Sequence, residues 1–264
     1  SHRGDYDLCY IVDKKIDGIR QKVADFINAD KGEIVFTYGT TSSLNSVAFG
    51  YALGKLRPGD EILLCFSEHA SNVLPWFKVA SLTGAKIKYI PLDEKGRVTV
   101  EAASSLIGEK TKIVSLAAVS NVLGYIAPIK EIASLVHAHG GVMVVDGAQS
   151  VPHMKTDVRD LDCDFLAFSG HKMCGPTGIG VLYVKKEIFP EIGPILYGGG
   201  MNDKFHSDGS MKLLRGPEKM EAGTLNIAGI YGLGAAIDYL SAIGMDEIKK
   251  HDGELKRYAV SELS

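Results

Sequence analysis

The residue best placed to do chemistry in this sequence is Lys172, within the stretch Ser169-Gly170-His171-Lys172. It follows the apolar residues 165–168, and His171 beside it can also carry a positive charge. Burial and a nearby second cation favour the neutral, nucleophilic form of an amine. Such an amine can form an imine with an aldehyde. A lone lysine is more often a solvated surface residue, so its neighbours decide between the two interpretations.

An acid and two amides follow other apolar segments. Asp146 directly follows the apolar residues 142–145, and Gln149 lies three residues after Asp146. A carboxylate at the end of a buried strand is costly unless it is paired. A protonated pyridine nitrogen is one suitable partner, and a metal ion, a ribose or a helix cap would also serve. Asn121, which follows residues 112–116, could donate to a ring oxygen or build a turn.

Hydroxyl groups and a histidine follow two further segments. Thr40 and Thr41 come after residues 33–37, where free helix amides and hydroxyls suit a phosphate group, although a plain helix N-cap is the alternative. No Gly-Lys-Ser/Thr follows, so this is not a nucleotide-binding P-loop. His69 follows residues 61–65 and could stack on an aromatic cofactor or move a proton, or could only cap a turn.

Short apolar strands and helices alternate through the sequence. We expect strands at residues 33–37, 61–65, 86–90, 112–116, 142–146, 165–168 and 180–184, and helices at 10–27, 41–56, 73–82, 100–107, 129–138 and 228–243. The strands are near-continuous Val, Ile and Leu, as in parallel strands buried on both faces. The pattern predicts a three-layer α/β/α domain with a mostly parallel central sheet. Ligands bind outside the carboxyl ends of such strands, so the residues above should meet at one edge of the sheet.

The C-terminal third is less regular. Residues 198–218 are polar and Gly-rich, and we expect them to form a long loop. Residues 255–264 have the pattern of an amphipathic helix with no Gly or Pro to end it. We therefore expect the chain to be cut short there, with a large domain at residues 1–243 and the start of a small C-terminal domain at residues 244–264.

Composition narrows the class of protein. The 264 residues are 45% hydrophobic and 23% charged, with a net charge of −3, which argues against nucleic-acid and membrane partners. No apolar run approaches the ~20 residues needed to span a bilayer. The four cysteines form no Cys-x-x-Cys pair, so we interpret them as small buried side chains, reduced in the cytoplasm, and not as disulfides or metal ligands. They are Cys9, Cys65, Cys163 and Cys174.

Taken together, the motifs resemble those of the class V, fold-type I enzymes that depend on pyridoxal 5'-phosphate (PLP). The resemblance is greatest to the cysteine desulfurase and selenocysteine lyase group, in the branch that serves the SUF iron–sulfur machinery. It runs in family order along nearly the whole chain. The matching stretches are His2-Arg-Gly4, Gly39-Thr-Thr41, Glu68-His69 with Asn72, Ser120-Asn-Val-Leu-Gly124, Val145-Asp-Gly-Ala-Gln149 with Val151-Pro-His-Met154, Asp162-Cys-Asp-Phe165, Ser169-Gly-His-Lys172, Gly175-Pro-Thr-Gly-Ile-Gly180, and Glu221-Ala-Gly-Thr224 with Asn226.

The resemblance implies roles around the cofactor ring. Lys172 is similar to the lysine that holds the cofactor as a Schiff base and moves the substrate α-proton. His69 matches the histidine stacked on the ring. Asp146 matches the partner of the ring nitrogen, and Gln149 the partner of the phenolic oxygen. Asn121 matches a residue near the substrate carboxylate and the ring oxygen.

The resemblance also implies a phosphate cup and a homodimer. Thr41, with Thr40 beside it, matches the cup, which Ser169 and His171 join. Thr224 matches a threonine that reaches the phosphate of the neighbouring subunit.

The implied activity is that of a cysteine desulfurase, which removes sulfur from L-cysteine to give alanine and an enzyme persulfide for iron–sulfur cluster assembly. A sulfur-acceptor protein is then an expected partner. The family's nucleophilic cysteine and substrate-binding arginine belong to the C-terminal small domain, and neither segment is present in these residues. Cys174 is not assigned as that nucleophile. Selenocysteine lyase, class V aminotransferase and a noncatalytic PLP-binding or dimerising module are the alternatives.

Overall fold

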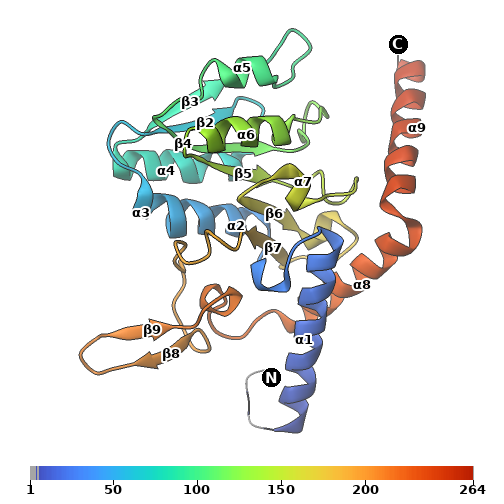
Figure 1. The fold of residues 1–264 in the computed structure, drawn as a ribbon. Coiled ribbons are helices and arrows are strands. Elements are labelled where there is room, and N and C mark those ends of the chain that lie inside the picture. Colours follow the sequence, from blue (N-terminus) through green and yellow to red (C-terminus); the bar gives the residue numbers. More distant parts are fainter. Residues whose placement is uncertain (1–3, 5, 264) are drawn as a thin grey trace.

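The computed structural model describes residue 4 and residues 6–263, so His2 and Arg3 of the first family motif lie outside the described residues. Its centre is a seven-stranded sheet in the order β1-β7-β6-β5-β4-β2-β3 (Figure 1). All strands run parallel except β7, which is antiparallel to both β1 and β6. The predicted mostly parallel α/β sheet is therefore confirmed. The strands are β1 (Ile34–Thr37), β2 (Glu61–Cys65), β3 (Lys86–Ile90), β4 (Thr111–Ala117), β5 (Val142–Asp146), β6 (Phe165–Ser169) and β7 (Gly180–Val184).

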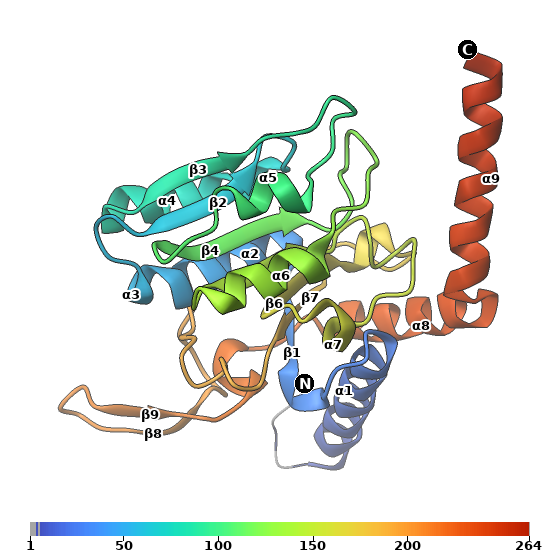
Figure 2. The same cartoon turned by 45° about the horizontal axis from the view of Figure 1, so that its top comes forward.

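Helices cover both faces of this sheet (Figures 1 and 2). Helices α1, α6 and α8 pack on one face, and α2 and α4 on the other. The single helix predicted over residues 41–56 forms as α2, a π-helical turn (Ala48–Ala52) and α3. The helices are α1 (Asp7–Phe26), α2 (Thr40–Val47), α3 (Leu53–Lys55), α4 (Leu74–Thr83), α5 (Val100–Ser104), α6 (Ile129–Ala138), α7 (Val158–Leu161), α8 (Ile227–Ile243) and α9 (Met245–Leu263).

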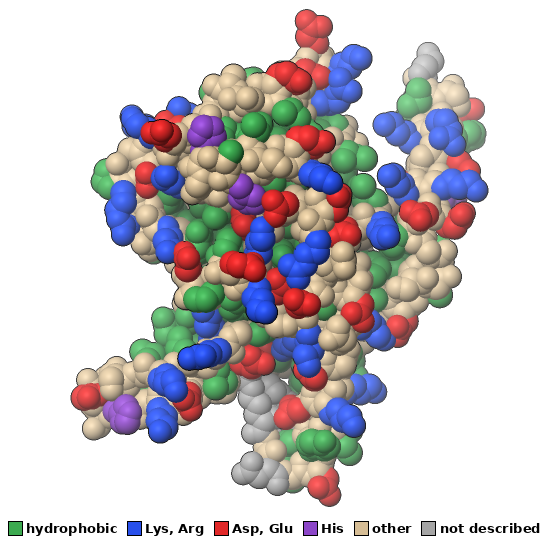
Figure 3. Space-filling model, in the orientation of Figure 1, with side chains coloured by type: hydrophobic (Ala, Val, Ile, Leu, Met, Phe, Trp, Pro, Cys, Tyr) green, Lys and Arg blue, Asp and Glu red, His purple; other side chains and the backbone are tan. Residues whose placement is uncertain are grey.

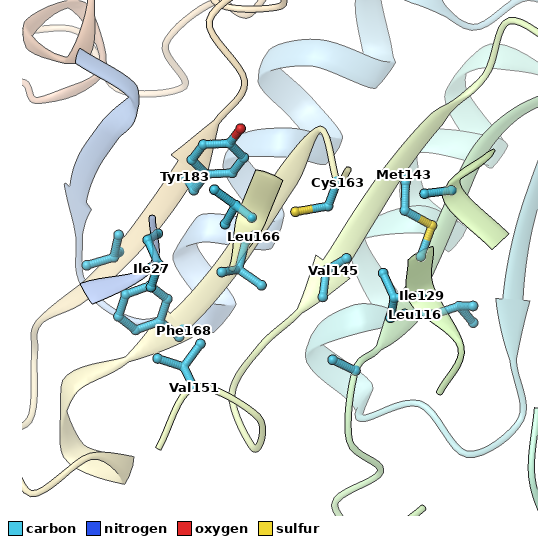
Figure 4. Close-up of a cluster of buried hydrophobic side chains, with 14 of the residues drawn as sticks. Ile27, Leu116, Ile129, Met143, Val145, Val151, Cys163, Leu166, Phe168 and Tyr183 are labelled. Atoms are coloured by element: carbon cyan, nitrogen blue, oxygen red, sulfur yellow. The ribbon is translucent and has the colours of Figure 1, made fainter. Parts of the chain in front are cut away.

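Successive residues of each strand enter opposite layers. In β4, Val114 and Leu116 pack into the layer formed with α1, α6 and α8, whereas Ile113 packs with α2 and α4. Figure 4 shows part of the first layer, where Leu116, Val145 and Leu166 come from three neighbouring strands. Because both faces of the sheet are buried, these strands have almost no polar side, which explains their continuous apolar pattern.

Strand β7 runs against its neighbours because the connection before it is short. Only residues 170–179 separate β6 from β7, and they include the 3-10 turn Gly170–Lys172. A parallel connection needs a dozen or more residues to cross back over the sheet. The segment that carries Lys172 is therefore held between two adjacent, hydrogen-bonded strands.

Two sequence predictions are wrong. Within residues 198–218, predicted to be a loop, β8 (Asn202–Phe205) and β9 (Met211–Leu213) pair as an antiparallel hairpin. Both strands are largely exposed, so no alternation of apolar and polar residues marks them. Cys174 is exposed, whereas the other three cysteines are buried. It lies in the turn after Lys172, with a φ of 62°.

Helix α9 stands apart from the sheet (Figures 1 and 2). It begins after Gly244, and its axis is bent by 74° from that of α8. None of its described side chains is buried, and a hydrogen bond of 2.9 Å between His153 Nδ1 and Asp252 Oδ2 connects it to the segment after β5. The predicted division between residues 243 and 244 falls at this break, and a separate domain beyond it stays a prediction.

The surface carries both signs of charge. Acidic and basic side chains are interspersed over the face shown in Figure 3. Among the residues described, no single helix has both the length and the apolar character to cross a membrane, and α8 and α9 meet that test only as a bent pair. Helix α8 buries Ile230, Leu233 and Ile237 in the core of the protein.

Candidate functional site

A cavity of about 190 Å³ lies at the carboxyl ends of the parallel strands. It gathers side chains that follow β1, β2, β4, β5 and β6, because the carboxyl ends of parallel strands meet at one edge. Every predicted site residue except one lines it, and the roles of these residues stay predictions. The nine are Thr40, Thr41, His69, Asn121, Asp146, Gln149, Ser169, His171 and Lys172.

The start of helix α2 forms one wall of this cavity. The Thr40 backbone N–H donates to Ser169 Oγ at 2.8 Å, and the two hydroxyl oxygens of these residues are 2.7 Å apart. Thr41 Oγ1 lies 2.8 Å from Ser71 Oγ. Gly39 precedes the helix with a φ of 142°, which favours glycine. Four hydroxyl groups therefore gather at the positive end of an eight-residue helix, a combination that suits a phosphate group.

Strand β7 enters the sheet against this wall at Gly180. A Cβ at this position would lie 2.4 Å from Gly39 Cα and 2.7 Å from the Phe168 carbonyl oxygen. Because these neighbours are backbone atoms, we expect Gly180→Ala to lower the free energy of unfolding by about 1–3 kcal/mol, measured by chemical denaturation. Gly18→Ala is the control, since a Cβ there meets nothing within 4 Å. This helical substitution should raise stability by up to about 1 kcal/mol. Wild-type stability in Gly180→Ala would show that the two backbones do not lie this close.

His69 comes from the short segment after β2. Its Nδ1 accepts a hydrogen bond of 3.1 Å from the Ser71 backbone N–H, so it caps the 3-10 turn Ala70–Asn72. With Nδ1 as acceptor, the neutral ring carries its proton on Nε2. The ring is exposed, lines the cavity and makes no other hydrogen bond with the described residues. Capping therefore fixes the ring and leaves it available to a ligand.

Asp146 and Lys172 face the same cavity. Asp146 is buried, and its Oδ1 accepts from the Ala148 backbone N–H at 2.9 Å. Burial raises the pKa of this carboxyl, although the Ala148 N–H and the neighbouring Lys172 and His69 side chains act against that shift. Lys172 is half-buried and forms no hydrogen bond or ion pair with any described residue. The cavity thus combines a buried acid with an uncommitted amine.

Two amide side chains on the cavity wall are also uncommitted. Asn121 and Gln149 make no side-chain hydrogen bond within the part of the chain that the structure describes, so each can donate to or accept from a ligand. Thr224 lies elsewhere. It is exposed, between the 3-10 turn Pro217–Met220 and α8, and it does not line the cavity.

These groups suit a phosphate-bearing aromatic aldehyde. The hydroxyl groups and the α2 amides suit its phosphate, the Asp146 carboxyl a protonated ring nitrogen, and the Lys172 amine its carbonyl. A larger cavity of about 1050 Å³ lies beside Phe189, Leu213 and Lys219. It contains none of the residues that follow the parallel strands, so size does not identify the site.

Two residues near the site were missed from the sequence. Ser71 lines the cavity and supports Thr41, and only its place two residues after His69 pointed to it. Glu68 accepts hydrogen bonds from the backbone at the end of β4. It belonged to a recognised motif but had no assigned role there.

Known proteins resemble this chain over its whole length. The family model described as aminotransferase class V matches residues 1–264. The probable cysteine desulfurase of Halalkalibacterium halodurans is 51% identical over 265 residues, covering 100% of this chain and 65% of that protein. The solved apo structure of a cysteine desulfurase from Thermococcus onnurineus NA1 has a TM-score of 0.95 at 41% identity, covering 99% of this chain and 65% of the other. A solved C-DES mutant with glycine covalently linked to its PLP cofactor has a TM-score of 0.81 at 27% identity, covering 93% of this chain and 65% of the other. The chain therefore spans just under two thirds of the length of these proteins.

Proposed function

Because the chain belongs to the aminotransferase class V family, we propose that the cavity is the cofactor site of an L-cysteine desulfurase. The observation that carries the proposal is the meeting of Lys172, Asp146 and the hydroxyl-lined start of α2 in one cavity. Identity of 51% with a probable cysteine desulfurase supports the choice of substrate. The whole protein would remove sulfur from L-cysteine and release alanine, leaving a persulfide on an enzyme cysteine.

The cofactor is pyridoxal 5'-phosphate, and the donors in the cavity fit it. When bound, it withdraws electrons from the substrate α-carbon. Asp146 would hold the positive charge on the ring nitrogen, and that charge would offset the cost of burying the carboxylate. His69 would cover one face of the ring and exclude water. Gln149 would donate to the phenolic oxygen.

The remaining cavity residues would bind the phosphate and the substrate. Thr40, Thr41, Ser169 and His171 would surround the phosphate group. Lys172 Nζ would hold the cofactor and then take and return the α-proton of the substrate. Its lack of any ion pair in the described part of the chain leaves the amine available for both tasks.

Other parts of the proposal concern the whole protein. The chain spans 65% of the length of the relatives above, so the nucleophilic cysteine and the arginine for the substrate carboxylate would come from outside these residues. We further propose a cytoplasmic homodimer in which the exposed Thr224 reaches the neighbouring site. A sulfur-acceptor protein of iron–sulfur cluster assembly would then take the persulfide sulfur.

The test is the product balance of the full-length protein loaded with PLP and given L-cysteine with a thiol reductant. We expect alanine and sulfide in equal amounts, measured by amino-acid analysis and sulfide trapping. The control is the same protein without PLP, which should form neither. Alanine from L-selenocysteine alone would indicate a selenocysteine lyase, and transfer of the amino group to a 2-oxo acid an aminotransferase. No turnover of any of these by PLP-loaded protein would favour a noncatalytic module.

A further inference from the structure

Glu68, which directly precedes His69, accepts hydrogen bonds from other residues on both of its carboxylate oxygens. The backbone N–H of Ala117 donates to Oε1 at 3.1 Å and to Oε2 at 2.9 Å. Asn72 Nδ2 donates to Oε2 at 2.7 Å. Ala117 ends β4 and pairs in register with Asp146 on β5. Glu68 therefore joins the segment that carries His69 to the strand end beside Asp146.

The same hydrogen bonds continue into the core through Asn72, which is fully buried. Its Oδ1 accepts from Ser115 Oγ at 2.6 Å and from Trp76 Nε1 at 3.2 Å. Both polar atoms of the Asn72 side chain are thus engaged, so its amide cannot reverse without losing bonds. Trp76 is buried and is the only tryptophan in the sequence. Its indole N–H is therefore linked to Glu68 through a single side chain.

The Glu68 carboxyl is subject to opposed influences. Burial has the largest effect and raises its pKa to about 7, while the hydrogen bonds from Asn72 and Ala117 lower it and the negative charge of Asp146 raises it again. Both hydrogen-bond partners are donors, so they favour the ionised carboxylate. The charge of Glu68 is therefore expected to change in the neutral pH range.

Among the described residues, few other titratable groups are near Glu68. They are Asp146 on β5, Tyr125 in the segment after β4, Cys65 at the end of β2, and the adjoining His69. No described lysine or arginine forms an ion pair with Glu68. Its partners are therefore neutral donors, and the bonds they make depend directly on the charge of the carboxyl.

On the basis of the proposed function, we propose that Glu68 is a positioning residue of the cofactor site. As a carboxylate it fixes the His69 segment against β4 and Asp146, and this fixation weakens when the carboxyl takes up a proton. Hydrogen bonds to an ionised acceptor are about twice as strong as neutral ones. A protonated carboxyl would also place its O–H against donors. His69 and Asp146, assigned to the ring face and the ring nitrogen, are thus best aligned above neutral pH.

The first test uses cofactor-free protein and Glu68→Gln, which keeps the shape and one acceptor oxygen but cannot ionise. The emission of Trp76 in the wild type should change with pH, with a midpoint near 7, and Glu68→Gln should abolish that change. Trp76→Phe measures any emission that arises elsewhere in the full-length protein. Glu94→Gln, an exposed position after β3, is the matched control and should titrate like the wild type.

Thermal stability gives a second readout without cofactor. The folded state holds the Glu68 proton more tightly than the unfolded state, in which the carboxyl has its ordinary pKa of 4.5. The wild type should therefore lose stability as the pH rises from about 4.5 to 7. The Tm of Glu68→Gln relative to the wild type should rise between pH 5 and pH 8, whereas that of Glu94→Gln should not.

The third readout is the visible circular dichroism of the PLP-loaded protein, which reports how the ring is held. The wild-type band should grow between pH 6 and pH 8. Glu68→Gln should show a weaker band that does not change with pH, and Glu68→Asp should keep the pH dependence.

Two results would overturn the proposal. One is a Trp76 emission that does not change with pH in the wild type, and the other is an emission that changes with pH in Glu68→Gln as it does in the wild type. If Glu68→Gln does not fold, flat profiles in both the wild type and Glu68→Asp would overturn it. A wild type that takes up no PLP would overturn the proposed function instead, and the Trp76 titration would still decide the charge at Glu68.

Discussion

Replacing Lys172 by alanine should leave a folded protein that loses PLP on dialysis and forms no alanine from L-cysteine. Lys172 carries the only amine that lines the cavity within the described part of the chain. Alanine can neither hold an aldehyde covalently nor move the α-proton. Loss of proton transfer alone costs about 10²–10⁴-fold in rate, and loss of covalent retention adds to that. The absorbance of bound cofactor after dialysis and the rate of alanine formation by full-length protein measure the two effects.

The matched control is Lys78→Ala, an exposed lysine of α4 that forms no ion pair with the described residues. It removes the same charge without touching the cavity, so retention and rate should stay at wild-type values. Circular dichroism in the far ultraviolet would show that both variants are folded. Full PLP retention in Lys172→Ala after dialysis would contradict the assignment of this lysine.

The placement of the site could be predicted because it depends on local signals and one topological rule. Asp146 and Lys172 each follow a short apolar run, and parallel strands bring their carboxyl ends to one edge. The antiparallel direction of β7 was not predicted. Its cause, the short connection of residues 170–179, was visible in the sequence.

Other features could not be predicted because they depend on contacts between distant segments. The hairpin of β8 and β9 is exposed and therefore lacks the alternation that marks a half-buried strand. The hydrogen bond between Glu68 and the Ala117 backbone joins residues 49 positions apart, and no sequence pattern in either segment predicts it. Cys174 is exposed on a turn with a positive φ, whereas its residue type favours burial.

The pairing of Arg20 with Glu221 joins residues that lie still further apart, at a separation of 201 residues. Arg20 donates to the two oxygens of Glu221 at 2.6 and 2.8 Å, and the side chains are only 7% and 1% exposed. The guanidinium also donates to the Ile34 carbonyl oxygen at 2.6 Å, and the Phe36 N–H donates to Glu221 at 2.8 Å. The pair therefore ties α1 and β1 to the segment that leads to Thr224.

Arg20→Met should lower the free energy of unfolding by about 3–5 kcal/mol, because it removes a buried guanidinium together with its hydrogen bonds to Glu221 and to the Ile34 carbonyl oxygen. For a chain of this size the loss corresponds to roughly 6–20 °C in Tm, measured by calorimetry. Lys22→Met is the control. Lys22 also lies on α1 and forms an ion pair of 2.6 Å with Asp238 of α8, but both side chains are substantially exposed. Lys22→Met should therefore lower the free energy of unfolding by less than about 1 kcal/mol.

Glu221→Gln in the Arg20→Met background should recover part of the lost stability. The neutral amide removes the buried negative charge that Arg20 no longer balances, and it keeps an oxygen that can accept from the Phe36 N–H. Equal losses of unfolding free energy in Arg20→Met and Lys22→Met would mean that the buried pair stabilises the protein no more than the exposed pair does. Recovery in the double variant would instead show that the loss of stability comes from the buried negative charge of Glu221. Since Glu221 lies three residues before Thr224, Arg20→Met should then also disturb the segment proposed to reach the neighbouring subunit.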